Sequence, residues 1–221
     1  GDFLMCQAHD PAPVHFYKPS PASRNGHSEK PSPAVRPVIE KTYSYTDALG
    51  RELFQAVRLK PKDFRQRHMV DGAWVWTMDG VERVLYRLPE VLKATEVWVV
   101  EGEKDAESLA AMGFCATTNI GGAGKWLDGY TETLKGKDVV ICGDNDEPGQ
   151  KHVEKVFDSV AKKAKSVRLV KLAANHHDAT DAVEVLGDKA REAFTAWRDA
   201  AVPHIGGVRM PVYSMADIQP R

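Results

Sequence analysis

Beyond Glu96, short apolar runs alternate with amphipathic segments, and this alternation restricts the folds open to the chain more than any other feature. The apolar runs are rich in β-branched residues and lack a polar face, which predicts strands buried on both sides: TEVWVV, FCATTN, KDVVICG and SVRLVKL. Helices are predicted between and after them: KDAESLAAMG, EPGQKHVEKVFDSVAKKAK, 179–186 and 188–200. The pattern predicts an α/β fold, with a parallel sheet of about four strands flanked by helices.

The segment 41–93 follows a different pattern, of short β-rich runs separated by turn residues. Turns are expected at Leu49-Gly50 and Asp79-Gly80, each joining two strands of a hairpin. We therefore expect a small, β-rich, basic subdomain over 41–93 and the α/β domain over 94–200. The stretches 1–40 and 201–221 contain Pro, Gly and Ser with little apolar periodicity, so they are expected to be a flexible arm and a tail.

Composition excludes some classes of function. The 221 residues carry a net charge of -1 and are 43% hydrophobic, so a globular core is expected, but the overall charge does not indicate a nucleic-acid partner. No apolar run approaches the roughly 18 residues of a membrane span, and the few cysteines indicate a reduced, cytoplasmic protein. Cys6 and His9 would form only half of a zinc site, so an incidental pair is favoured and zinc is not expected.

Local positive charge is concentrated in VRLKPKDFRQRH, where five basic residues accompany the single acid Asp63 and the interleaved Phe64. They are Arg58, Lys60, Lys62, Arg65 and Arg67. One interpretation is a surface that binds the phosphates of a single-stranded template, with Trp74 and Trp76 nearby for base stacking. The other is a solvated strand edge that charge protects from aggregation.

Acidic residues follow three of the predicted strands. Glu101 follows the first, Asp144 and Asp146 follow the third, and Asp178 and Asp181 follow the fourth. Because ligands bind at the carboxyl ends of the strands in an open parallel sheet, these carboxylates are expected to gather in one crevice. Their repulsion would raise their pKa values, and a hard divalent cation, Mg²⁺ or Mn²⁺, would relieve it. GDNDEPG taken alone also fits a helix start, with an Asp N-cap and a Pro in the first turn.

Two further features are candidates for phosphate contacts beside this crevice. The loop NIGGAGKW follows the second predicted strand, where Gly121 and Gly122 would let the backbone approach a phosphate and Lys125 would supply charge. A flexible connection is the alternative. Lys104 stands in the first turn of the helix after Glu101, a position consistent both with a phosphate contact and with a plain surface lysine.

Two of these strand endings, EGEKDA at 101–106 and GDNDEPG at 143–149, together resemble the Toprim domain of DnaG-type primases, topoisomerases and certain nucleases. Residues that match the first motif of the primase members are Glu101, Gly102 and Asp105. Residues that match the second are Asp144, Asp146 and Gly149, and the further Asp pair of primase-like members resembles Asp178 and Asp181. The resemblance implies a Rossmann-like Toprim fold from Glu96 to about residue 186.

The same resemblance implies metal-dependent nucleotidyl transfer, in which nucleoside triphosphates are joined into a primer on single-stranded DNA. The implied catalytic residues are Asp144 and Asp146, as metal ligands, and Glu101, which would complete the coordination or act as general base on the 3′-hydroxyl. Asp105, Asp178 and Asp181 would either bind a second metal or orient the first ligands. The segment ahead of the motifs looks like that of phage and plasmid primase-helicases, and VYSMADIQPR resembles the lead into a RecA-like helicase domain. The expected protein is a DNA primase of a mobile element, acting with a helicase or ATPase domain fused downstream or separate.

Two other functions would use the same residues. A metal-dependent nuclease is the first, since His176 and His177 stand beside Asp178. A Toprim module without catalytic activity, kept for DNA binding or for recruiting a helicase, is the second. Glu103 and Lys104 replace the aromatic and apolar residues of cellular members, which moves the resemblance toward the mobile-element branch, and the short basic subdomain argues against efficient primer synthesis by this chain alone.

Overall fold

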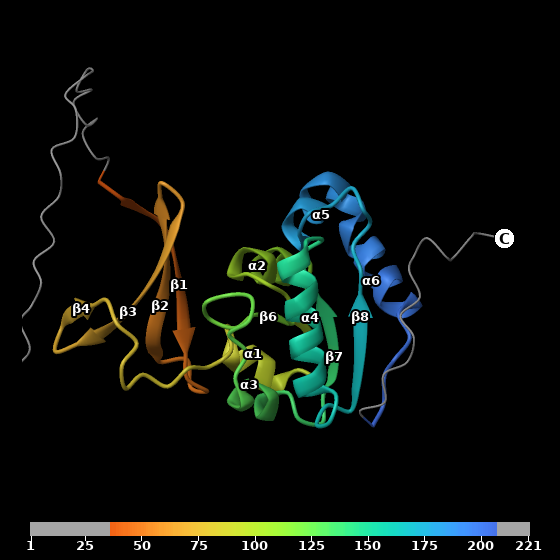
Figure 1. Cartoon of the computed structure of the whole chain (residues 1–221), viewed down its shortest axis with the longest axis horizontal. Helices are drawn as coiled ribbons and strands as arrows, with labels where there is room; N and C mark the ends of the chain where they lie inside the picture. The colour runs from red at the N-terminus through yellow and green to blue at the C-terminus, as the bar shows by residue number, and fades with distance from the viewer. Residues whose placement is uncertain (1–35, 207–221) are drawn as a thin grey trace, which may run out of the picture. The chain divides into compact units, whose positions relative to one another are not determined.

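The computed structural model describes residues 36–206 of the chain. Two four-stranded sheets make up this part, an antiparallel sheet followed by a parallel one, with helices around the parallel sheet (Figure 1). The Cys6 and His9 pair and the segment VYSMADIQPR lie outside the described residues, as do most of the expected arm and most of the expected tail.

The predicted β-rich subdomain is confirmed as an antiparallel sheet whose strands pair in chain order, β1-β2-β3-β4. The strands are β1 (Val38–Thr46), β2 (Glu52–Lys60), β3 (Asp63–Val70) and β4 (Ala73–Val75). The turn between β1 and β2 passes through Gly50 at a φ of 82°, where the sequence predicted a turn. Tyr43 of β1 lies opposite Ala56 of β2, and both side chains are buried, so one face of this sheet belongs to a core.

The hairpin predicted at Asp79-Gly80 is wrong. The Asp-Gly pair that joins two strands is Asp71-Gly72, between β3 and β4, where both residues have the positive φ of a tight hairpin turn, 49° and 81°. From β4 to helix α1 (Leu88–Lys93) the chain forms no further strand. The apolar residues of this stretch are buried by tertiary packing instead, because Tyr86 joins one hydrophobic core and Leu85 joins the other.

The predicted parallel sheet of four strands is confirmed, in the order β6-β5-β7-β8. The strands are β5 (Glu96–Val99), β6 (Ala116–Thr117), β7 (Asp138–Cys142) and β8 (Ser166–Val170). The helices of this domain are α2 (Glu103–Ala111), α3 (Asp128–Thr133), α4 (Glu147–Val160), α5 (Ala179–Leu186) and α6 (Ala190–Ala200), with a 3-10 turn at Gly187–Lys189. The short helices α1 and α3 fall where no helix was predicted.

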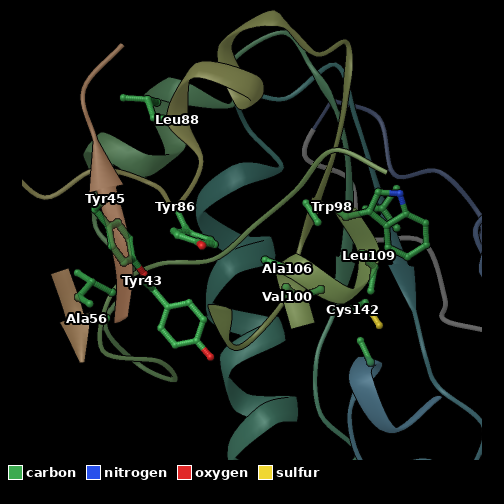
Figure 2. Close-up of a cluster of buried hydrophobic side chains, with 14 of the residues drawn as sticks. Tyr43, Tyr45, Ala56, Tyr86, Leu88, Trp98, Val100, Ala106, Leu109 and Cys142 are labelled. Carbon is green, nitrogen blue, oxygen red and sulfur yellow. The ribbon is translucent and has the colours of Figure 1, made fainter. Parts of the chain in front are cut away.

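The parallel sheet separates two hydrophobic cores. Along β5, Trp98 faces one core while Val97 and Val99 face the other, as expected for side chains that alternate across a strand. The first core also contains the buried aromatic residues of the antiparallel sheet, so one cluster runs from Tyr43 and Tyr45 to Trp98 (Figure 2). The antiparallel sheet therefore packs on side chains of the parallel-sheet domain. None of the helices between residues 36 and 206 combines the length and apolar character that a membrane span needs.

Candidate active site

Parallel strand order brings the predicted acids to one edge of the sheet. Glu101 follows β5, Asp144 follows β7 and Asp178 stands in the segment after β8, and these three strands are neighbours in the sheet. A helix begins at each of these turns, with Gly102, Asp146 and Asp178 as the N-caps of α2, α4 and α5. This edge therefore presents carboxylates and helix N-termini together, where open α/β sheets bind ligands.

Glu101 and Asp144 both approach Gly149 of α4. A Cβ atom at Gly149 would lie 2.7 Å from the backbone oxygen of Asp144 and 2.9 Å from Oε2 of Glu101, closer than real Cβ atoms come to other atoms. The Oε2 atom of Glu101 is buried and has no hydrogen-bond partner within residues 36–206. A buried carboxylate oxygen without a partner is destabilising, and a bound cation would remove that cost.

The charges of the acids act on one another. Burial raises the pKa of Asp144 to about 7, and the charges of Glu101, Asp105 and Asp178 add to this effect. Burial also raises the pKa of Glu101, and the charge of Asp146 adds to the rise, while a hydrogen bond with the Asp144 backbone lowers it in part. A divalent cation at this edge would stabilise the charged form of both carboxyl groups.

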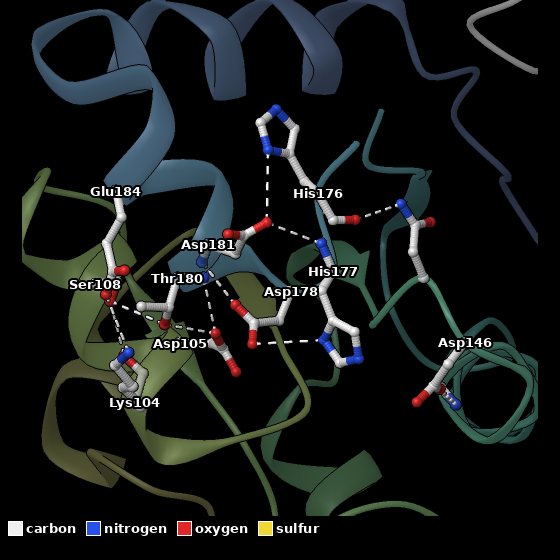
Figure 3. Close-up of polar contacts among 12 residues, drawn as sticks. Lys104, Asp105, Ser108, Asp146, His176, His177, Asp178, Thr180, Asp181 and Glu184 are labelled. Carbon is white, nitrogen blue, oxygen red and sulfur yellow. Dashed lines mark hydrogen bonds and ion pairs between the residues drawn. The ribbon is translucent and has the colours of Figure 1, made fainter. Parts of the chain in front are cut away.

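Asp105 lies in the first turn of α2 and binds helix α5 (Figure 3). Its Oδ1 atom accepts hydrogen bonds from the N–H of Thr180 at 2.9 Å and from the Thr180 hydroxyl at 2.6 Å. Burial raises the pKa of Asp105, although the bonds from Thr180 lower it in part. Lys104 pairs with Glu184 of α5 at 3.1 Å, with both side chains exposed. Asp105 and Lys104 therefore connect α2, which follows β5, to α5, which follows β8.

Asp146, Asp178 and Asp181 form hydrogen bonds within their own turns. Oδ1 of Asp146 accepts from the N–H of Gly149 at 2.7 Å, so the helix-start interpretation of GDNDEPG is confirmed. Asp178 caps α5 in the same way, accepting from the N–H of Asp181 at 2.7 Å. Asp181 in turn accepts from the N–H of His177 at 3.0 Å (Figure 3).

Asn145 is a residue to which sequence reasoning assigned no role. Its side-chain amide lies 3.3, 2.9 and 2.7 Å from the backbone oxygens of Leu172, Ala173 and His176. The backbone N–H of Asn145 donates to the backbone oxygen of His177 at 2.8 Å. These bonds hold the turn after β7 against the segment after β8. The sequence offered one indication of this role. Asn145 stands between two acids, and in an extended segment successive side chains point in opposite directions, so its side chain points away from theirs.

Within the part of the chain that the structure describes, no three His, Cys, Asp or Glu side chains are grouped as a ready-made metal centre. Asp146 and Asp178 each cap a helix N-terminus through one oxygen, and Asp105 binds α5 through its Oδ1. Glu101 and Asp144 nevertheless fit a divalent cation. Both are oxygen donors whose pKa values burial raises, and Glu101 has an unpartnered buried oxygen.

A pocket with a volume of about 460 Å³ lies beside Glu101, lined by residues of β2 and β3 and of the segments that follow β5 and β6. Arg65 lines it from β3, and so do the loop residues predicted to contact phosphate, Gly121, Gly122 and Lys125. The structure thus brings one of the acids, one of the five predicted DNA-binding residues and the glycine loop to a single pocket. We name it the acid pocket.

The other residues predicted to bind DNA have separate environments. Arg58 pairs with Glu40 at 2.7 Å, while Lys60, at the end of β2, and Lys62, in the β2–β3 turn, are exposed. The guanidinium of Arg67 has aromatic neighbours: it lies 4.0 Å from the centre of the Trp74 ring and 5.4 Å from that of Trp76. Trp76 is 49% exposed, so a cation and an aromatic ring are available together on this surface.

Comparison with known proteins identifies the parallel-sheet domain. Residues 96–172 match the family model of the Toprim domain. A DnaG primase catalytic domain bound to single-stranded DNA is similar in structure, with 21% identity and a TM-score of 0.55 over 73% of this chain and 51% of that one. A DNA primase domain from Pseudomonas aeruginosa gives 24% identity and a TM-score of 0.56 over 73% and 51%.

The primase fragment of the bacteriophage T7 primase-helicase protein gives 21% identity and a TM-score of 0.52 over 71% of this chain and 61% of the fragment. The chain therefore spans from 51% to 61% of the length of these structures. No curated protein matches the chain in sequence. Residues 96–172 are a Toprim domain, and the chain has the fold of the catalytic cores of DnaG-type primases.

Proposed function

We propose that this protein is a metal-dependent nucleotidyltransferase of the DNA primase type, which makes primers on single-stranded DNA during replication of a phage, plasmid or other mobile element. The observation that carries the proposal is the pair Glu101 and Asp144. They are mutually repelling carboxyl groups at the ligand-binding edge of a Toprim domain, and one buried oxygen of the pair has no partner among residues 36–206. The large majority of buried side-chain oxygens in proteins are hydrogen-bonded.

Glu101 and Asp144 would hold the cation, Mg²⁺ or Mn²⁺, and Asp146 stands next to them at the start of α4. When bound, the cation would stabilise the negative charge that develops on the attacking 3′-oxygen and on the leaving pyrophosphate. Glu101 would complete the coordination of the cation or accept the proton of the 3′-hydroxyl. Asp105, Asp178 and Asp181 would hold the surrounding turns in position.

Nucleoside triphosphates and the template strand would meet in the acid pocket. Lys125 and the backbone of Gly121 and Gly122 would contact phosphate groups, and Arg65 would do so from the antiparallel sheet. The exposed Trp76 and the neighbouring Arg67 would hold the template by stacking and charge. The likeness to a DnaG catalytic domain bound to single-stranded DNA supports this choice of template.

A RecA-like helicase or ATPase domain, fused downstream or separate, is the proposed partner. The likeness to the primase fragment of the T7 primase-helicase protein supports it, because that primase is part of a chain that also contains a helicase. A helicase would supply the single strand on which primers are made.

The test is primer synthesis by the purified chain on single-stranded DNA with labelled nucleoside triphosphates, in Mg²⁺ and separately in Mn²⁺. We expect short labelled products from the wild type and none from Asp144→Asn or Glu101→Gln. Asp158→Asn is the matched control, because Asp158 is an exposed acid on α4. The wild type making no product with either cation, alone or with a helicase added, would exclude the proposal.

A metal-dependent nuclease is the second candidate. Nδ1 of His177 lies 3.7 Å from Oδ2 of Asp178, which places an imidazole beside the acidic edge. The same assay separates the two functions when the template carries the label. Shortening of the template that disappears in Asp144→Asn would identify a nuclease, whereas a template of unchanged length with labelled new products would identify a primase.

A further inference from the structure

A second pocket, with a volume of about 420 Å³, adjoins the acid pocket. The two share the glycine loop and β3, through Gln66, Ile120, Gly121 and Lys125. The second pocket differs in its lining, because it contains no Asp or Glu and extends over α3 and α4 instead of the acidic edge. Its volume is within the range of small-ligand sites in proteins.

The lining of this second pocket is positively charged. Arg83, Lys125 and Lys155 all line it. Nζ of Lys155 donates to the backbone oxygen of Gly124 at 2.6 Å, which holds the lysine beside the loop. Within residues 36–206, neither Arg83 nor Lys125 forms an ion pair. Three cations around a concave surface without a compensating acid favour an anionic ligand.

Tyr130 of α3 supplies an independent observation. The residue is 1% exposed and lines the pocket, and its hydroxyl is buried with no hydrogen-bond partner among the described residues. Burial raises the pKa of Tyr130 to about 12, so at neutral pH the hydroxyl keeps its proton and can donate it. Buried polar groups normally have a partner, and a hydroxyl without one in a cationic pocket points to a ligand with acceptor oxygens.

The glycine loop suits the approach of such a ligand. Gly121 and Gly124 line the pocket and have φ values of 82° and 79°, a conformation that residues with a side chain rarely adopt. Nothing lies within 4 Å of the Cβ position of Gly124, so the loop leaves open space at this residue. Glycine-rich loops with basic residues are a general arrangement for binding phosphate.

We propose that this second pocket binds phosphate groups of a nucleotide ligand, through Arg83, Tyr130 and Lys155 together with Lys125. The inference rests on the proposed function, which supplies the nucleotide or DNA ligand. It adds contacts from α3, α4 and the segment before α1 to those of the acid pocket. The phosphate groups belong either to a nucleoside triphosphate or to the backbone of a DNA strand.

The test is calorimetric binding of ATP, adenosine and an oligothymidylate to the full chain in EDTA, which removes any contribution of a divalent cation. We expect ATP, the oligonucleotide or both to bind, and adenosine to bind at least about tenfold more weakly than ATP. Arg83→Ala and Lys155→Ala should each weaken phosphate-dependent binding about tenfold, the effect of losing one charge-assisted contact. Lys162→Ala, which removes an exposed charge just after α4, should have no effect.

Tyr130→Phe separates ligand binding from stability. Removing an unpartnered buried hydroxyl should not lower the thermal unfolding midpoint, whereas the loss of a donor should weaken binding about threefold or more. Loss of ATP binding alone in the variants assigns the pocket to the free nucleotide, and loss of oligonucleotide binding alone assigns it to the strand. The proposal is overturned when neither ligand binds the wild type, or when Arg83→Ala and Lys155→Ala bind both as the wild type does.

These outcomes are independent of primer synthesis. A protein that makes no primers but binds phosphate through Arg83 and Lys155 would retain the pocket and lose the primase function. A protein that makes primers, but whose pocket variants all bind phosphate as the wild type does, would retain the primase function and lose the pocket.

Discussion

The hydroxyl of Tyr45 donates a 2.7 Å hydrogen bond to Oε1 of Glu103, and this bond joins the antiparallel sheet to the helix that follows Glu101. Tyr45 is fully buried and stacks on Phe54, with ring centres 4.5 Å apart. Burial raises the pKa of Glu103, and the bond from Tyr45 lowers it in part. Glu103 thus connects the antiparallel sheet to α2, and it lines the acid pocket.

Tyr45→Phe is expected to destabilise the protein by about 1–3 kcal/mol, because it leaves a largely buried carboxylate without its donor. The measurement is the free energy of unfolding in urea at neutral pH. Tyr86→Phe is the matched control: the Tyr86 hydroxyl donates to Glu107 at 3.1 Å, but Glu107 is more exposed and also pairs with Lys41. Equal losses in the two variants would contradict a special role for the Tyr45–Glu103 bond.

Gly149→Ala is expected to destabilise the protein by about 1–3 kcal/mol, as overpacking does, and to weaken Mg²⁺ binding. The added Cβ would lie 2.7 Å from the backbone of Asp144 and 2.9 Å from the Glu101 carboxylate, so both acids must move. Thermal unfolding with and without Mg²⁺ measures both effects. Gly129→Ala in α3 is the control, since nothing lies within 4 Å of its Cβ position, and it should be neutral or stabilising by up to about 1 kcal/mol. A stable Gly149→Ala protein with normal Mg²⁺ binding would contradict the packing described here.

The stability of the metal-free protein should depend on Asp144 and on pH. The folded-state pKa of Asp144 is about 7, above the ordinary value of 3.8, so between these pH values the folded state binds more protons than the unfolded state. The contribution of Asp144 to the free energy of unfolding therefore falls as pH rises through this window. Wild-type stability in EDTA, relative to that of Asp144→Asn, should be higher at about pH 5 than at about pH 8.

A second group titrates in the opposite direction. Burial lowers the pKa of His152 to about 4, so its contribution to stability is lost as pH falls below the ordinary value of 6.5. Comparison with Asp144→Asn cancels this effect, since both proteins contain His152. Adding Mg²⁺ at about pH 8 should then stabilise the wild type more than the variant. A wild-type-to-variant difference that does not change with pH would contradict the environment assigned to Asp144.

Binding of single-stranded DNA should depend on the surface formed by Arg67 and Trp76. Trp76→Ala is expected to weaken binding of an oligothymidylate by about 1–3 kcal/mol, as the loss of one stacked base does, with no loss of stability because the ring is half exposed. Fluorescence anisotropy measures the affinity. Leu49→Ala, at an exposed apolar position in the β1–β2 turn, is the control. Unchanged affinity in Trp76→Ala would leave the solvated strand edge as the better interpretation of the basic segment.

The strands and the longer helices of the Toprim domain were predictable because their signals are local. A buried strand needs apolar residues on both faces and a helix needs an apolar stripe with a cap, and both patterns are visible over a few residues. The positions of Glu101, Asp144 and Asp178 followed from the same logic, since parallel strands end at one edge of the sheet. The failure at Asp79-Gly80 has the converse cause: the apolar residues after it, such as Tyr86, are buried by tertiary packing in a core that includes side chains of both sheets.

The sequence by itself thus determined the order of the elements and the edge where the acids lie. Only the tertiary structure decided which partners the oxygens of those acids have. Asp105, Asp146 and Asp178 form hydrogen bonds with backbone or hydroxyl groups, whereas Glu101 retains an unpartnered oxygen. The cationic pocket of Arg83, Tyr130 and Lys155 likewise has no sequence signature, because its residues come from three distant segments. Charge, burial and hydrogen bonding depend on distances through space, and spacing along the chain does not specify those distances.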